Sequence, residues 1–487
     1  MKKLIGLDIG TLSTKGVLVD QDGTLLAREV VPHNIEYPKP GWVEQDAEKI
    51  WWAETVRVLR GLLAQVPDEI NEIAGIGISG LFPALAIADE DGRVIRPALL
   101  YSDNRASHEL ELLNEHFHLA LTGDAITPKL AWLKSNEPEN LRRIHFIFSS
   151  HNYIVYKLTG TYCIDYKVAS SLGGLLDPDR LEWREDLLTW IGLDRSHLPK
   201  LCSPIDLVGQ ITQEASSVTG LPVGMPVISG SGDSLFTLIG AGVINQGEAL
   251  LSLGTTGWLG VLPHDLEAYF HNPKLAHHGA PYLLCAYLLS LGSTLCWIRD
   301  KFAFSEKLAA EQQRFSMFQL LDEAASNIPA ASEGVCVLPY FQGNRQLNIM
   351  EPVTGAICGL RLSHNPIHIY RGLLESYGYV VRSAIEKLST DGIPLKRFVF
   401  TGSGSGSVLW RQIISDITGK SWQHYANLEP CLGNAFLVGY ALGNYSSLTK
   451  IRDWLPKPSI HFPNEKNRQL YDDAYERFVL LRSALSV

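Results

Sequence analysis

The chain has 487 residues, of which 46% are hydrophobic and 19% are charged, and its formal net charge is −10. This length predicts two domains, and the composition is typical of a soluble globular enzyme. The acidic balance and the lack of a basic stripe in the sequence argue against a nucleic-acid-binding protein. No apolar stretch in the sequence reaches the roughly 18 residues that a membrane span needs.

The seven cysteines are scattered along the sequence and form no C-x-x-C pair. Such an odd, unpatterned set is typical of buried thiols in a reducing compartment rather than of a disulfide framework. We therefore expect a cytoplasmic protein.

The first part of the chain predicts strands that alternate with a helix. Residues 4–20 form two β-rich runs around a tight polar turn, which indicates a β-hairpin, and residues 24–31 predict a third strand. Asp46 is a candidate helix cap, because apolar residues recur after it at helical spacing. Short buried strands are expected at residues 73–79 and 85–88. This succession indicates an α/β layer fold.

The second half repeats this pattern. A strand at residues 249–253 runs into a glycine- and threonine-rich turn, as the first strand does, and residues 397–400 predict another strand. Further helices are expected at residues 108–117, 129–135, 149–158, 316–327, 366–388 and 408–417, and in the tail. Glycines become frequent between residues 220 and 260, which indicates a domain boundary near residue 242. The expected parts are residues 1–242, residues 243–448 and a C-terminal helical tail, residues 449–487.

Asp8 interrupts the first apolar run near the place where we expect the strand to end at a site, and Gly10 follows it closely. A glycine there lets backbone amides approach an oxygen-rich ligand, while Thr11 adds a hydroxyl and Lys15 a positive charge. A carboxylate beside such donors suits a hydrated Mg²⁺ ion carried on nucleotide phosphates. The alternative is a plain hairpin with a turn-favouring aspartate.

Asp233 is the sharpest candidate acid. It follows the small residues 229–232 and has apolar residues on both sides, which predicts a half-buried position at a cleft. A carboxylate in such a place can accept a proton from a hydroxyl as that hydroxyl attacks phosphorus. The alternative is that Asp233 caps the helix expected at residues 234–239.

Two glycine-rich turns of the second half are candidate phosphate and nucleotide sites. The turn Gly254-Thr255-Thr256-Gly257 offers amides and hydroxyls without net charge, and it fits a phosphate cradle or a plain turn equally well. The segment Gly402-Ser403-Gly404 precedes a helix, and its missing side chains would admit the sugar and base of a nucleotide. A flexible loop is the alternative for this segment.

Other familiar site motifs are missing from the sequence. The run Gly419-Lys420-Ser421 looks like the end of a P-loop, but Ile414 stands where the earlier glycine is required. The fifteen histidines form no H-E-x-x-H motif, and the pair His277-His278 is more typical of a surface than of a metal site.

The ordered set of motifs resembles the FGGY carbohydrate kinases and, within them, the xylulokinase-like branch. The resemblance covers almost the whole chain. It depends on residues 8–11, 101–105, 128–133, 158–160, 232–233, 254–256, 338–345 and 401–404. Each motif is modest alone, but their order and spacing together are specific.

The resemblance implies an α/β fold of two actin-like ATPase (RNase H-like) domains that flank a deep catalytic cleft. It implies ATP and Mg²⁺ as cofactors, with Asp233 as general base on the sugar hydroxyl and Asp8 and Asp233 at the metal. The expected nucleotide-binding residues are Asp8, Gly10, Thr11, Lys15, Gly254, Thr255, Thr256, Gly402, Ser403 and Gly404. The expected sugar-binding residues are Phe82, Pro83, Asp103, Arg105 and Asp233.

The sequence departs from the family pattern chiefly in the sugar region. Where the xylulokinase-like branch carries Gln-Met-His-Gly, this chain has Leu81-Phe82-Pro83-Ala84, so a histidine that would bind the sugar is missing. Smaller departures are Gly343-Asn344-Arg345 for Gly-Glu-Arg, Gly402-Ser403-Gly404 for a triple glycine, and Asn152 for an aspartate. We expect these changes to alter recognition rather than phosphoryl transfer, with the apolar Phe82 and Pro83 forming a wall that reads the sugar by shape.

From these observations we expect ATP-dependent phosphorylation of a small sugar, first of all a pentulose such as D-xylulose. The alternatives are a kinase for ribulose, L-xylulose, gluconate or glycerol, an actin-like ATPase that couples hydrolysis to partner binding, and a sugar sensor without turnover. The expected partner is a small-molecule sugar, with a homodimer left open as the assembly; neither nucleic acid nor membrane is expected.

Overall fold

The computed structural model describes residues 2–254, 256–276, 283–288, 291–302, 316–341, 344–346, 349–351, 354–426, 428–429 and 431–485. The chain forms two compact units, and each is built from segments that are distant in the sequence. The first comprises Met1–Ile244, Leu266–Tyr282 and Glu429–Trp454, and the second comprises Asn245–Asp265, Leu283–Leu428 and Leu455–Val487. The division of the sequence into parts at residues 242 and 448 stays a prediction about functional domains.

The strands of the first unit are β1 (Lys3–Ile9), β2 (Ser13–Val19), β3 (Leu25–Pro32), β4 (Glu44–Gln45), β5 (Ile73–Gly80), β6 (Ala86–Ala88), β7 (Ala98–Leu99), β8 (Phe146–Phe148), β9 (Cys163–Asp165), β10 (Leu176–Asp177), β11 (Glu182–Trp183), β12 (Lys200–Cys202), β13 (Leu207–Gln210), β14 (Pro226–Ile228) and β15 (Ser231–Gly232). Its helices are η1 (Ala47–Trp52), α1 (Ala53–Gln65), η2 (Pro67–Glu72), α2 (Ser107–Phe117), α3 (Ile126–Asn136), α4 (Pro138–Arg142), α5 (Ser150–Thr159), α6 (Tyr166–Ser170), α7 (Glu185–Ile191), η3 (Arg195–His197), α8 (Gln213–Thr219), α9 (Asp233–Gly240), α10 (Leu266–His271), η4 (Pro273–Ala276), α16 (Leu432–Ala441) and η7 (Leu448–Trp454).

The strands of the second unit are β16 (Glu248–Ser252), β17 (Gly257–Val261), β18 (Leu284–Leu288), β19 (Cys336–Leu338), β20 (Asn344–Gln346), β21 (Ile349–Glu351), β22 (Ala356–Cys358), β23 (Arg397–Thr401), β24 (Trp422–His424) and β25 (Ser459–His461). Its helices are α11 (Leu291–Phe302), α13 (Met317–Ser326), η5 (Ala330–Gly334), α14 (Pro366–Thr390), η6 (Ser403–Gly406), α15 (Val408–Thr418), η8 (Glu465–Asn467) and α17 (Arg468–Ala484).

The main sheet of the first unit is built on the opening hairpin. β1 and β2 are antiparallel, with Asp8 opposite Lys15, and β3 extends the sheet antiparallel to β2. On the other side of β1, β5 is parallel to it, and the strand order is β13-β14-β5-β1-β2-β3, with β15 also paired to β5. The predicted hairpin, third strand and α/β succession are therefore confirmed.

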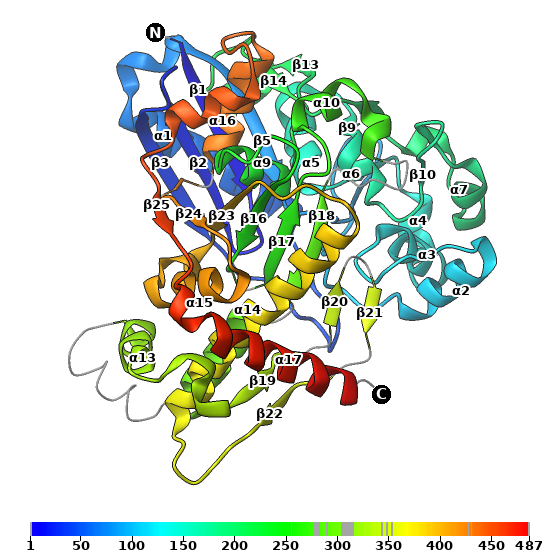
Figure 1. The fold of residues 1–487 in the computed structure, drawn as a ribbon. Coiled ribbons are helices and arrows are strands. Elements are labelled where there is room, and N and C mark those ends of the chain that lie inside the picture. The colour runs from blue at the N-terminus through cyan, green and yellow to red at the C-terminus, as the bar shows by residue number, and fades with distance from the viewer. Residues whose placement is uncertain are drawn as a thin grey trace. The chain divides into compact units, whose positions relative to one another are not determined.

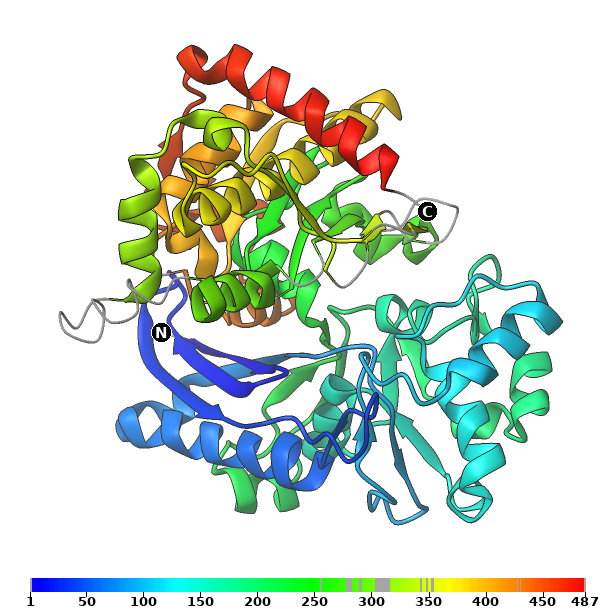
Figure 2. The same cartoon turned by 90° about the horizontal axis from the view of Figure 1, so that it is seen from below.

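Helices cover both faces of this sheet. α1 packs against β2 and β3 on one face, whereas α16, which comes from late in the sequence, packs against β1 and β5 on the other (Figure 1 and Figure 2). Asp46 caps the helical segment before α1, as predicted, because its side chain accepts the N–H groups of Glu48 and Lys49. The sheet between these helices contributes the buried core of the unit.

Residues 85–198 form a second core of the first unit. It gathers apolar side chains of α2, α3, α6 and α7 around the two-stranded pairing of β6 with β8. The predicted helices at 108–117, 129–135 and 149–158 are confirmed as α2, α3 and α5, with boundaries shifted by a few residues.

The sheet of the second unit repeats the order of the first. β16, β17 and β18 form an antiparallel meander, and β23 and β24 follow as parallel strands on the other side of β16 (Figure 1). The order β18-β17-β16-β23-β24-β25 thus matches β3-β2-β1-β5-β14-β13, with an antiparallel strand closing each series. The repetition that the sequence indicated is real at the level of topology.

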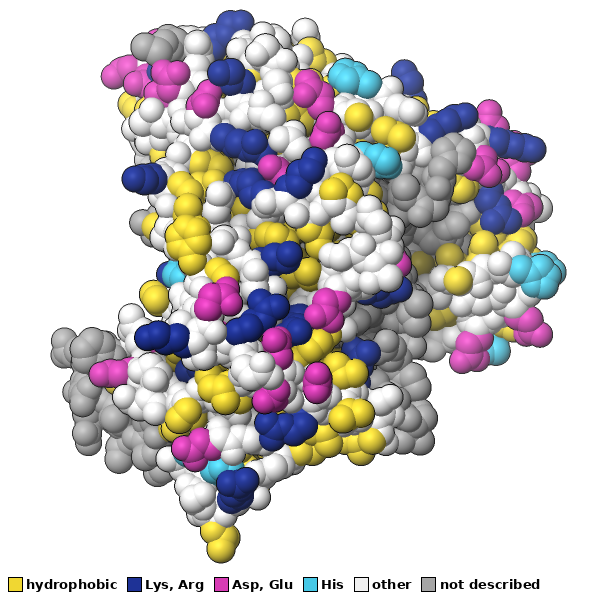
Figure 3. Space-filling view, viewed as in Figure 1, with side chains coloured by type: hydrophobic (Ala, Val, Ile, Leu, Met, Phe, Trp, Pro, Cys, Tyr) yellow, Lys and Arg dark blue, Asp and Glu magenta, His cyan; other side chains and the backbone are white. Residues whose placement is uncertain are grey.

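Helices α14 and α15 pack against each other and form the core of the second unit with the sheet. The tail helix α17 packs on the same unit and buries Tyr471 and Phe478, so the prediction that the tail returns to the body is confirmed. Among the described residues, no helix has both the length and the apolar character that a membrane crossing requires. On the face drawn in Figure 3, basic and acidic side chains are interspersed with apolar ones.

Candidate active site

Asp8 lies near the end of β1 and is held by its neighbours on both adjacent strands. The hydroxyl of Ser79 on β5 donates to Asp8 Oδ1 at 2.7 Å, and Lys15 Nζ on β2 lies 3.8 Å from Asp8 Oδ2. The carboxylate is buried, with 9% of the residue exposed. Burial raises the pKa of Asp8, and the charge of Lys15 and the Ser79 hydrogen bond oppose that rise.

The position of Ser79 depends on α16. The side-chain amide of Asn434 donates to the Ser79 hydroxyl oxygen at 2.7 Å and also to the backbone carbonyl of Leu7. A chain of hydrogen bonds thus runs from α16, a helix late in the sequence, to the carboxylate of Asp8. Sequence reasoning missed both Ser79 and Asn434, because no local motif marks either residue.

The turn between β1 and β2 is also anchored from outside the hairpin. Gly10 N–H donates to the Ser13 carbonyl at 3.0 Å and closes the turn. The side-chain amide of Gln45 donates to the Thr11 carbonyl at 2.9 Å, and His33 Nε2 lies 3.1 Å from the Gly10 carbonyl oxygen. These contacts hold the backbone around Gly10 and Thr11 in one conformation.

Asp233 is brought to the same edge of the sheet by strand register. β15 pairs in parallel with β5, so Ser231 lies beside Ser79, the residue that also lies beside Asp8 on β1. The chain leaves β15 at Gly232 and begins α9 with Asp233. Asp233 is therefore the first residue of the helix, and the residue in the cap position is Gly232.

The two carboxylates interact electrostatically. The pKa of Asp233 is raised to about 6, first by burial and second by the negative charge of Asp8. The charges of Lys167 and Lys15 and a hydrogen bond from the Ser234 amide act in the opposite direction. A buried carboxylate whose pKa is raised by a second carboxylate, with cations nearby, is typical of a site for proton transfer or for a metal ion.

Lys167 is a site residue that sequence reasoning missed. It lies in the short helix α6, is 2% exposed, and its Nζ is 3.5 Å from the centroid of the Phe82 ring. The same ring packs against Gly232, where a Cβ atom would lie 2.0 Å from Phe82 Cδ1. Gly232 is therefore required by the close approach of Phe82, which joins Lys167 to the segment that carries Asp233.

Asp165 fixes the orientation of α6. Its Oδ1 accepts the amides of Lys167 and Val168 and the hydroxyl of Ser231, so α6 and β15 share one carboxylate. Its Oδ2 lies 3.1 Å from His151 Nε2, and both side chains are fully buried. This buried pair is part of the support beneath Lys167 and Asp233.

Asp103 and Arg105 contact a different set of residues. Arg105 binds Asp103 through Nε at 2.9 Å and through Nη2 at 2.8 Å, and Nη2 also lies 2.6 Å from Glu44. Its guanidinium stacks 3.7 Å from the ring centroid of Trp42, and Asp103 accepts the Val43 amide. The predicted sugar-side residues thus form a buried ion-pair network, in which Arg105 Nη1 has no hydrogen-bond partner among the described residues.

The two glycine-rich turns of the second unit lie side by side. Gly404 N–H donates to the Leu253 carbonyl at 2.8 Å, and Leu253 N–H donates to the Thr401 carbonyl at 2.9 Å. Gly402 has φ +84°, and a Cβ atom there would lie 2.8 Å from the Leu253 carbonyl carbon, so only glycine fits. Gly254 and Thr256 follow Leu253 in the chain, whereas Thr255 lies outside the described residues.

The predicted site residues thus form two groups in the first unit and one in the second. In the first unit Asp8, Lys15 and Asp233 share an edge of the sheet with Phe82, which precedes the buried Pro83. Asp103 and Arg105 belong to the separate ion-pair network. In the second unit the segments 253–254 and 402–404 meet, and Ser403 is exposed.

Comparison with known proteins identifies the family. The model of the N-terminal domain of the FGGY family of carbohydrate kinases matches residues 3–240, and that of the C-terminal domain matches residues 249–442. The chain is 28% identical to a xylulose kinase of Escherichia coli (97% of each chain covered) and 27% identical to a gluconokinase of Bacillus subtilis (99% and 96% covered).

The crystal structure of a xylulose kinase from Rhodospirillum rubrum superposes with a TM-score of 0.86 at 27% identity, covering 99% of each chain. The fold expected from the resemblance, two actin-like α/β domains, is thereby confirmed. The chain belongs to the FGGY family of carbohydrate kinases, and it is a kinase that acts on a small-molecule sugar.

Proposed function

We propose that the chain transfers the γ-phosphoryl group of ATP to a hydroxyl of a pentulose such as D-xylulose, with Asp233 as general base. The observation that carries the proposal is the strand register that sets Asp8 and Ser231 on either side of Ser79, with Asp233 two residues beyond Ser231 at the start of α9. The xylulose kinases that align over nearly the whole chain support the choice of sugar.

Asp8 and Asp233 fit a Mg²⁺ ion. They offer carboxylate oxygens, which are the ligands that Mg²⁺ prefers, and a cation would relieve the repulsion that raises the pKa of Asp233. When bound, Mg²⁺ neutralises negative charge on the phosphates of the nucleotide. Thr11, Lys15, Gly254, Thr255 and Thr256 would contact those phosphates, and Gly402, Ser403 and Gly404 would line the adenosine pocket.

Asp233 would hold the proton that leaves the sugar. A carboxylate with a pKa of about 6 is a stronger base than an ordinary aspartate and is still ionised at neutral pH. It would accept the hydroxyl proton as the sugar oxygen attacks the γ-phosphorus and the bond to the leaving oxygen of ADP breaks. Lys15 and Lys167 would keep the base ionised between turnovers.

The sugar would lie against Phe82, with Arg105 on the polar side. Phe82 is half-buried and carries no hydrogen-bonding group, so it contributes shape and exclusion of water. Asp103 fixes the Arg105 guanidinium in place, and a sugar hydroxyl would give its buried Nη1, which has no partner among the described residues, a hydrogen bond.

A second candidate substrate is an aldonate such as gluconate. Lys167 places a positive charge beside the proposed base, where a sugar carboxylate would gain from it. The gluconokinase among the relatives is as similar to this chain as several of the xylulose kinases are.

A substrate panel tests these proposals. ADP release is measured with D-xylulose, L-xylulose, ribulose, gluconate and glycerol at equal concentrations, and D-xylulose is expected to give the highest kcat/KM. The proposal of a pentulose kinase is overturned if every pentulose is inert and gluconate is phosphorylated.

The variant Lys167→Met separates the two candidates further. If the sugar is neutral, KM for D-xylulose should change by less than about threefold, since methionine keeps the contact with Phe82. If the substrate is an aldonate, KM for it should rise by about tenfold or more, because a charged partner is lost in a buried site.

A further inference from the structure

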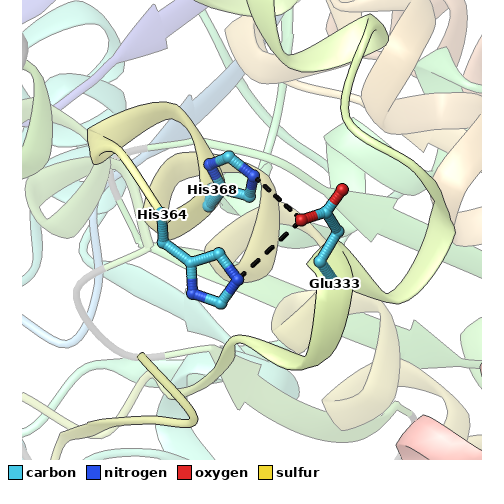
Figure 4. A group of neighbouring side chains, drawn as sticks. All are labelled: Glu333, His364 and His368. Carbon is cyan, nitrogen blue, oxygen red and sulfur yellow. Dashed lines mark ion pairs between the residues drawn. The ribbon is translucent and has the colours of Figure 1, made fainter. Parts of the chain in front are cut away.

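A second cluster of metal-ligating side chains lies in the second unit. Glu333 comes from the turn η5, His368 from the first turn of helix α14, and His364 from the segment just before that helix; all three side chains point toward one another (Figure 4). His368 Nε2 lies 3.7 Å and His364 Nε2 lies 3.9 Å from the same oxygen, Glu333 Oε2. The spacing His-x-x-x-His in residues 364–368 was the available sequence signal.

These distances are too long for hydrogen bonds but suit a shared ion. Ligand atoms bound to a tetrahedral Zn²⁺ at its usual bond lengths are about 3.4 Å apart, so a small inward movement of each side chain would suffice. The burial of His364 supports an ion site independently of these distances. Its side chain is 1% exposed, and its Nε2 has no hydrogen-bond partner among the described residues. Buried nitrogen atoms of this kind are normally paired.

The turn that carries Glu333 is held in an unusual conformation. Ala331, Ser332 and Glu333 have φ angles of 67°, 48° and 51°, which residues other than glycine rarely adopt. Glu375 of α14 stabilises this turn by accepting the Ala331 amide at 3.1 Å and the Ser332 hydroxyl at 2.7 Å. Helix α14 therefore carries His368, begins just after His364, and fixes the turn that presents the glutamate.

The partners of the two Nδ1 atoms decide which ring nitrogens are free to bind an ion. His368 Nδ1 lies 2.9 Å from Asn365 Oδ1 and 3.2 Å from the Asn365 backbone nitrogen. The shorter contact, to the amide oxygen, favours a proton on Nδ1 and leaves the Nε2 lone pair facing Glu333. His364 Nδ1 accepts the Arg361 amide at 3.0 Å. Coordination through its Nε2 would move the proton to Nδ1 and return that amide to water, which is feasible because Arg361 is exposed.

We propose that Glu333, His364 and His368 bind one Zn²⁺ ion that joins η5 to the N-terminus of α14. Two imidazole nitrogens and one carboxylate oxygen suit Zn²⁺ and disfavour Mg²⁺, which prefers oxygen ligands. The side chain of Glu333 is 49% exposed, so the ion can enter from solvent and keep a water molecule as its fourth ligand. This site is separate from the Mg²⁺ proposed at Asp8, and it does not depend on the proposed function.

The test is a titration of the EDTA-treated, dialysed full-length chain with Zn²⁺ by calorimetry, in the presence of excess Mg²⁺. One equivalent should bind, and Co²⁺ in place of Zn²⁺ should give the visible d–d absorption of a tetrahedral nitrogen and oxygen site. His364→Ala should weaken Zn²⁺ binding by about 100-fold or more. Glu333→Gln should weaken it as well, and this exposed, nearly isosteric change keeps the fold testable if the histidine variant unfolds.

The matched control is His108→Ala, which removes an exposed histidine of α2 in the other unit and should leave Zn²⁺ binding unchanged. The melting temperature of the parent chain should rise with Zn²⁺ concentration, and that of Glu333→Gln should not. Failure of the parent chain to bind one equivalent overturns the proposal. So does equal affinity in the parent chain, Glu333→Gln and His364→Ala.

Discussion

The two main sheets have the same strand order but different chemistry at the ends of their corresponding strands. At the end of β1 the first unit has Asp8 beside Ser79, whereas at the end of β16 the second unit has Ser252 beside Thr401. The first edge carries carboxylates and lysines, and we call it the charged edge. The second carries hydroxyls, amides and glycines, and we call it the neutral edge. The shared topology determines where a site can form, and the residues at the strand ends determine what that site can do.

The largest expected effect is on the charged edge. Asp233→Asn should lower kcat by about 1,000-fold, because the amide cannot accept the sugar proton. ATP binding, measured by calorimetry, should stay within a few-fold of the parent chain. Near-normal turnover in this variant would contradict the role of Asp233 as general base.

A paired substitution compares the equivalent positions of the two sheets directly. Asp8→Asn should lower kcat by roughly 100-fold and raise the Mg²⁺ concentration needed for half-maximal activity, since a ligand charge is lost. Ser252→Ala, at the matching strand end, should change kcat by less than about tenfold. Equal losses in both variants would show that the difference between the edges has no catalytic meaning.

The charged edge should also cost stability, and the neutral edge should not. The folded-state pKa of Asp233 is raised to about 6, so its ionisation lowers the free energy of unfolding as pH rises from about 4 to 6. Above pH 6 the full loss persists. Asp233→Asn should therefore raise the free energy of unfolding by roughly 2–3 kcal/mol at pH 8 and leave it nearly unchanged at pH 4.

Urea unfolding at the two pH values measures this effect. Asp68→Asn, an exposed aspartate in η2, is the control and should show no such pH-dependent gain. A gain of equal size at pH 4 and pH 8 would mean that the charge of Asp233 is not its cause.

The smallest expected effect is on the neutral edge. Gly402→Ala should destabilise the chain by about 1–2 kcal/mol and raise KM for ATP, because φ is +84° and the new methyl group would press on Leu253. Gly406→Ala is the matched control in the same segment, since a Cβ atom there meets nothing within 4 Å. Similar melting temperatures and KM values for the two variants would show that the contact with Leu253 does not require glycine at position 402.

Local patterns in the sequence predicted the elements well. The hairpin of β1 and β2, the cap at Asp46 and the long helix α14 each depend on periodicity and turn residues within a short window. Asp8 and Asp233 could be singled out for the same reason, because a carboxylate inside an apolar run is visible without a structure.

The supporting residues could not be predicted in this way. Lys167 and Asn434 occur in segments without a motif, and their roles arise only because distant elements pack beside β1 and β15. The turn that carries Glu333 could not be predicted either. Its three residues with positive φ angles rarely adopt them, and hydrogen bonds to Glu375 stabilise them in this conformation. Tertiary contacts of this kind override local propensity.

The helix α16 has a consequence for how the chain is made. It is encoded near the C-terminus, yet it packs on β1 and β5 and supplies the Asn434 amide that binds Leu7 and Ser79. During synthesis the opening strands therefore leave the ribosome long before their covering helix exists, although domains usually fold as they emerge. The edge of the first unit that carries Asp8 and Asp233 can be completed only when translation is almost finished. A nascent chain that stops at residue 428 holds strands β16 to β24 of the second unit but an unfinished first unit.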